Sequence, residues 1–132
     1  MGQELLDIDK GYQLRNRNKN YFGTGTKGGK VFRSSIKHYT YKYAVGFFYH
    51  HAIQNDKSFY SQDVIEGADY YATFHTTEAL AQKTQRYLIK NYQKHFPEGT
   101  DMTQVFEIVE LQQVDNKQYK LLKREARAIA NG

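Results

Sequence analysis

Residues 70–79, Tyr-Tyr-Ala-Thr-Phe-His-Thr-Thr-Glu-Ala, join a predicted strand to a predicted helix. Tyr70 to Phe74 are rich in strand-forming residues. Thr76 or Thr77 is a suitable helix N-cap, and Glu78 in the first turn complements the helix dipole. Leu80, Leu88 and Phe96 follow at helical spacing until Pro97 and Gly99 end the helix. This stretch therefore predicts a central helix that follows a strand.

Further elements are predicted on both sides of this unit. Strands are expected at 12–16, 31–33, 38–47 and 105–111, with a polar, turn-rich segment over 55–69. A glycine-rich, basic loop over 17–30 joins the first two strands into a long basic β-hairpin. Strands and helices in this order predict an α+β fold, an antiparallel sheet with the helices on one side.

A final helix is predicted after Asn116. Tyr119, Leu122, Ala126 and Ile129 form an apolar stripe along it. We expect this stripe to dock on the sheet, and pairing with another copy as a homodimer is the alternative. The domain boundaries follow: one domain over 1–132, with an N-terminal segment at 1–10, an α+β core at 11–114 and the C-terminal helix at 115–132.

Composition narrows the class of protein. The chain has 132 residues, a formal net charge of +5 and no cysteine, which excludes disulfides and thiol chemistry. No apolar run is long enough to cross a membrane, and the first residues carry neither a signal peptide nor a myristoylation pattern. We expect a cytoplasmic protein that does not bind membranes.

Charge is strongly segregated along the chain. Nine basic residues and no acidic one lie between Asp9 and Asp56. Tyrosine and phenylalanine are interleaved with them, so phosphate-binding cations and stacking rings come together. The sequence predicts that this region binds nucleic acid, a nucleoprotein or an acidic protein surface. The predicted binding residues are Arg15, Arg17, Lys19, Tyr21, Phe22, Lys27, Lys30, Arg33, Lys37 and Lys42.

An alternative function is enzymatic. His38-Tyr-Thr40 and His75-Thr-Thr77 resemble the paired H-x-T motifs of two-histidine phosphoesterases, in which His38 and His75 would serve as acid and base and Thr40 and Thr77 would bind phosphate. The spacing between the two motifs is short for the two lobes of that fold. We therefore expect binding rather than phosphodiester cleavage, with nucleotide sequestration as a further alternative.

The sequence predicts no cofactor and no metal. Gly23 to Gly28 spell G-x-G-x-x-G, but a strand follows where a dinucleotide site needs a helix. His50 and His51 are neighbours without a third ligand at suitable spacing.

The pattern over residues 12–111 resembles small phage proteins of the anti-CRISPR and anti-defence inhibitor type. The matching parts are Asn18 to Phe22, the helix entry at Tyr70 to Ala79 and the strand Phe106 to Glu110. The resemblance implies a non-catalytic inhibitor or host-takeover protein that acts in the host cytoplasm by binding a nucleic-acid-handling or defence complex. It transfers no functional residue.

Overall fold

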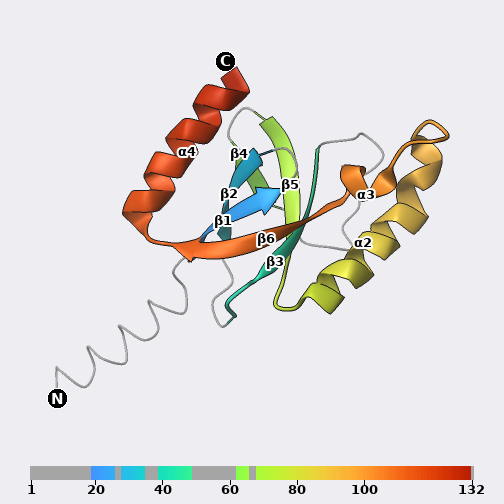
Figure 1. Cartoon of the computed structure of the whole chain (residues 1–132), viewed down its shortest axis with the longest axis horizontal. Coiled ribbons are helices and arrows are strands. Elements are labelled where there is room, and N and C mark those ends of the chain that lie inside the picture. Colours follow the sequence, from blue (N-terminus) through green and yellow to red (C-terminus); the bar gives the residue numbers. More distant parts are fainter. Residues whose placement is uncertain (1–18, 26–27, 35–38, 49–61, 66–67, 132) are drawn as a thin grey trace.

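The computed structural model describes residues 19–25, 28–34, 39–48, 62–65 and 68–131. These residues form an α+β fold with an antiparallel sheet, as the sequence predicts (Figure 1). The strands are β1 (Lys19–Gly25), β2 (Gly28–Ser34), β3 (Tyr43–Phe48), β4 (Gln62–Ile65), β5 (Ala68–His75) and β6 (Glu107–Val114). The helices are α2 (Glu78–Tyr92), the 3₁₀ turn η1 (Gln93–His95), α3 (Met102–Val105) and α4 (Asn116–Asn131).

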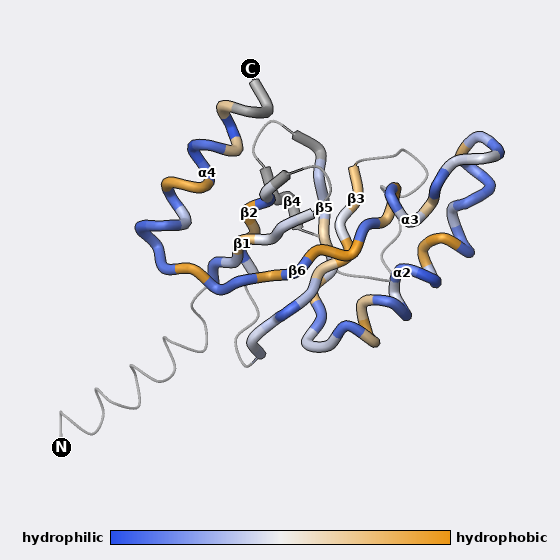
Figure 2. Tube along the Cα trace, viewed as in Figure 1, coloured by the Kyte–Doolittle hydropathy of each residue, from blue (hydrophilic) through white to orange (hydrophobic). Residues whose placement is uncertain are grey.

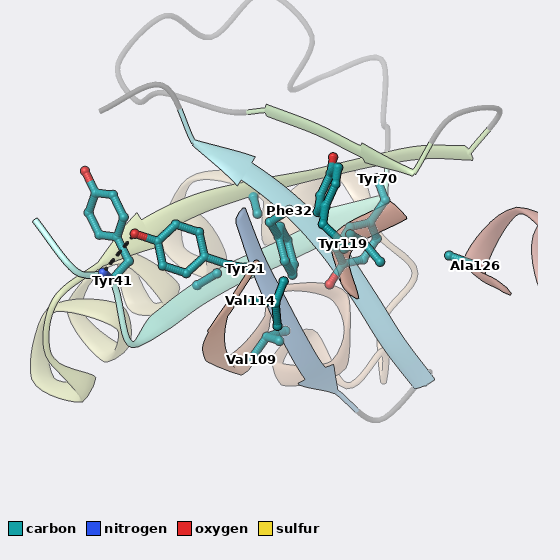
Figure 3. Packing of buried hydrophobic residues seen from close by; sticks show 11 residues of the cluster. Tyr21, Phe32, Tyr41, Tyr70, Val109, Val114, Tyr119 and Ala126 are labelled. Carbon is teal, nitrogen blue, oxygen red and sulfur yellow. Dashed lines mark hydrogen bonds between the residues drawn. The ribbon is translucent and has the colours of Figure 1, made fainter. Parts of the chain in front are cut away.

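The six strands form one curled sheet in the order β2-β1-β6-β3-β5-β4. The two edge strands, β2 and β4, approach each other, so the sheet curves around its inner face. Tyr21, Phe32, Tyr70 and Val109 fill that inner face (Figure 3). Since successive strand residues point to opposite faces, Val45 and Phe47 of β3 pack on the outer face instead.

The two long helices cover different faces of the sheet. α2 packs with Leu88 and Tyr92 on the outer face. α4 contacts β1, β2 and β4 and places Tyr119 and Ala126 in the inner cluster. The two helices lie on opposite sides of the sheet in Figure 1. The prediction that both helices lie on one side is wrong because each face of the sheet is apolar and needs its own cover.

The hairpin differs from the predicted one. Residues expected in a long loop over 17–30 are largely strand, because β1 pairs with β2 from Lys19↔Ser34 to Gly25↔Gly28. Glycine serves close packing here: a Cβ on Gly23 would lie 2.5 Å from Val109 Cγ1 and 2.7 Å from Phe32 Cε2. The predicted strand at 12–16 lies outside the described residues.

Other boundaries also shift. β3 begins at Tyr43 rather than at residue 38, and β6 runs to Val114. β4 falls in the segment expected to be turn-rich, where it pairs antiparallel with β5. The predicted helix ends as α2 at Tyr92 and continues only as η1. None of the described helices is long and apolar enough to cross a membrane.

Candidate nucleic-acid interface

A chain of aromatic rings leads from the inner core to the surface at the start of β3. The buried ring of Tyr21 lies 5.9 Å from that of Tyr41, centroid to centroid. Tyr41 in turn lies 6.4 Å from Tyr39, whose side chain is 56% exposed. Tyr39 therefore presents an aromatic surface to solvent that buried rings support from behind.

Hydrogen bonds fix the backbone of the segment from Tyr39 to Tyr41. The Tyr21 hydroxyl accepts from the Tyr41 amide over 3.4 Å (Figure 3). It donates to the Tyr39 carbonyl, also over 3.4 Å. Lys19 Nζ donates to the same carbonyl over 3.5 Å. Burial raises the pKa of Tyr21, and the bond from the Tyr41 amide opposes that shift only in part. The phenol is therefore protonated at neutral pH and can donate.

An open groove of about 370 Å³ lies beside this segment. Its lining residues come from the segment before β3, from the first residue of β3 and from β6: Thr40, Tyr41, Lys42, Tyr43, Glu110, Leu111 and Gln113. Such a volume suits a small planar ligand. The groove combines aromatic rings with one cation, one carboxylate and an amide, so it can stack on a planar group and hydrogen-bond to its edge.

Tyr21 and Lys30 do not lie on the surface where the sequence predicts a binding face. Tyr21 is fully buried, and Lys30 is 4% exposed. Lys30 Nζ lies 5.0 Å from the ring centroid of Tyr70 and 5.7 Å from that of Phe48. Phe22 is half-buried against the inner cluster. These three residues contribute to the curled sheet rather than to an exposed face.

Arg33 is exposed but tied to its neighbours. Its Nε donates to Asn20 Oδ1 over 3.0 Å, and its guanidinium Cζ lies 4.9 Å from the ring centroid of Tyr119. This cation opposes the burial that raises the pKa of Tyr119. The contacts attach Arg33 to α4, away from the groove residues.

The remaining predicted binding residues divide into two groups. Lys19 is half-buried and bonded to the Tyr39 carbonyl, and Lys42 is exposed and lines the groove. Arg15, Arg17, Lys27 and Lys37 lie outside the described residues.

Sequence reasoning overlooked a second basic surface. Lys117, Lys120 and Arg124 are exposed on α4 at spacings of three and four residues. Helical periodicity places them opposite Tyr119 and Ala126, which face the sheet. Figure 2 shows hydrophilic and hydrophobic residues alternating along this helix. The same spacing that predicts the apolar stripe would have revealed the basic one.

The residues proposed for phosphodiester cleavage are not assembled in the described part of the chain. Thr77 Oγ1 accepts from the Leu80 amide over 3.2 Å and caps α2. His75 ends β5, and its Nε2 lies 2.8 Å from Thr73 Oγ1. Burial lowers the pKa of His75, so this imidazole is neutral at pH 7. Thr40 lines the groove but His75 does not, and His38 lies outside the described residues.

Among the residues that the structure covers, no three metal-ligating side chains form a cluster. Comparisons with protein-family models, curated proteins and solved structures find no match for this chain. The interface is therefore interpreted from its own geometry.

Proposed function

We propose that this is a non-catalytic protein that binds single-stranded nucleic acid, with a base stacked on Tyr39 and phosphates paired with Lys19 and Lys42. The observation that carries the proposal is the exposed Tyr39 ring, which lies against Tyr41. Lys19 donates to the Tyr39 carbonyl, and Lys42 lines the groove together with Tyr41. Stacking on aromatic rings and pairing of phosphates with cations are the two contacts by which proteins bind single strands.

A single strand fits these features better than a duplex does. The bases of a duplex are stacked on each other and cannot lie on a tyrosine ring without being extruded. The groove beside Tyr39 has room for one planar group, and Gln113 and Glu110 offer hydrogen-bonding groups at its wall. An inhibitor of a host nucleic-acid-handling or defence complex, as the phage resemblance implies, would act through this same surface by occupying the nucleic acid or its binding site.

Removal of the Tyr39 ring tests the proposal. Tyr39→Ala should weaken binding of a labelled single-stranded oligonucleotide by about tenfold or more, since stacking on one ring contributes about 1–3 kcal/mol. Tyr39→Phe keeps the ring and should bind like the wild type. Tyr87→Ala, which removes an exposed tyrosine from α2, is the matched control. Unchanged affinity in Tyr39→Ala would contradict the proposal.

The enzymatic alternative is tested with the same probe. Wild-type protein should leave an end-labelled oligonucleotide intact over many hours. Cleavage that disappears in the His38→Ala/His75→Ala variant would establish phosphodiesterase activity and overturn the non-catalytic assignment.

A further inference from the structure

The outward face of α4 carries a row of cations that the groove does not include. Lys117, Lys120 and Arg124 are exposed and lie on one side of the helix. With a rise of about 1.5 Å per residue, they extend over roughly 10 Å. The described part of the helix carries one acidic residue, Glu125, so the row is not neutralised from within α4.

The first residues of β1 contact both the segment at Tyr39 and the start of α4. Lys19 donates to the Tyr39 carbonyl, and the next residue, Asn20, donates from Nδ2 to Oδ1 of Asn116, the first residue of α4. Arg33 donates to the same Asn20 side chain. Consecutive residues at the start of β1 thus bond the Tyr39 segment and the first residue of α4.

The chemistry of the α4 face favours phosphate over protein. Protein interfaces depend on aromatic and apolar anchors. Among the described residues of α4, Leu121 is the one large hydrophobic side chain that is substantially exposed, while Tyr119 is buried against the sheet. A row of cations without an exposed ring can pair with successive phosphates but cannot stack on bases.

We propose that the outward face of α4 binds the phosphate backbone of the same strand whose base stacks on Tyr39. The inference rests on the proposed function and deepens it, because the ligand must be a polynucleotide long enough to reach from the groove to α4. A mononucleotide or a very short oligonucleotide would occupy the groove alone.

The chain offers a matched control for testing α4. Lys83, Arg86 and Lys90 of α2 are likewise two lysines and one arginine, exposed at the same three- and four-residue spacing on the other side of the sheet. The test compares K117Q/K120Q/R124Q with K83Q/R86Q/K90Q. Both variants remove three charges, and glutamine preserves helix propensity.

Binding is measured with single-stranded oligo-dT probes of about 16 and about 4 nucleotides, near the limits of known site sizes. The α4 variant should bind the long probe at least tenfold more weakly at low salt. Its slope of log affinity against log salt should be shallower by about 2, which corresponds to three lost phosphate contacts. The α4 variant should bind the short probe with wild-type affinity. The α2 variant should bind both probes with wild-type affinity and wild-type salt slopes. Equal losses in both variants, or no loss in the α4 variant, would overturn the inference.

The wild-type protein provides a second readout that needs no substitution, because the long probe should give a slope steeper than the short one by about 2. Equal slopes for the two probes would also overturn the inference.

If Tyr39→Ala weakens binding of both probes while the α4 variant weakens binding of neither, the α4 inference fails and the proposed function stands. If Tyr39→Ala changes neither probe, the proposed function fails. An α4 variant that loses binding to poly-glutamate but not to the long probe would assign this face to an acidic protein.

Discussion

At the scale of single residues, the inner face of the sheet contains a buried polar contact. The Tyr70 hydroxyl donates to Glu107 Oε1 over 2.7 Å, and both side chains are buried. Burial, followed by the hydrogen bond and the charge of Glu107, raises the pKa of Tyr70 far above its usual value near 10. Tyr70 is therefore a hydrogen-bond donor at every physiological pH, and its hydroxyl solvates the buried Glu107 side chain.

Tyr70→Phe tests this contact. Loss of the hydroxyl leaves a buried carboxylate with one donor fewer, and we expect the free energy of unfolding to fall by about 1–3 kcal/mol. Chemical denaturation measures the change. Tyr39→Phe removes a hydroxyl from an exposed ring and should leave stability unchanged. Equal stability of Tyr70→Phe and wild type would show that the contact contributes nothing.

His75 predicts a dependence of stability on pH. Burial lowers its pKa in the folded state below the value of about 6.5 that it has in the unfolded chain. As pH falls below about 6.5, His75 takes up a proton more readily in the unfolded state than in the folded state. The free energy of unfolding therefore decreases toward acid pH. The free energy of unfolding should decrease less between pH 7.5 and 5.5 in His75→Gln than in wild type. A wild-type response in His75→Gln would refute the assignment.

At the scale of elements, α2 shows why some predictions succeeded. Its start depends on a local interaction, because Thr77 caps the Leu80 amide. Its apolar periodicity is also local, so both the cap and the helix can be predicted from neighbouring residues in the sequence. β1 and the first residues of β2 lie in the segment predicted as a loop, because glycine indicates turns locally, whereas here Gly23 fits between Phe32 and Val109. That requirement comes from distant residues and is invisible in the sequence around Gly23.

The cap itself is testable. Thr77→Ala leaves the first turn of α2 without its side-chain acceptor and should lower the free energy of unfolding by about 1 kcal/mol. Thr77→Ser keeps the hydroxyl and should stay close to wild type in thermal unfolding. If Thr77→Ala and Thr77→Ser have the same melting temperature, the hydroxyl does not stabilise the helix.

In the whole molecule, the curled sheet determines which of the predicted binding residues are accessible. The sequence correctly indicates that the region around Lys42 combines tyrosines with cations. It does not indicate which tyrosines face inward, since both faces of the sheet are covered and alternation alone gives no direction. Tyr21 and Lys30 turn into the structure, while Tyr39 and Lys42 remain accessible. The inhibitor role stays a prediction from the phage resemblance.

The salt dependence of single-strand binding by the wild-type protein is the sharpest test of the proposed binding surface. Lys19, Lys42 and the three α4 cations predict that log affinity for a labelled single strand falls linearly with log salt, with a slope of about −3.5. Affinity for the matching duplex should be weaker at each salt concentration, because its bases cannot stack on Tyr39. A slope near zero, or no measurable binding of single strands near physiological salt, would contradict the account.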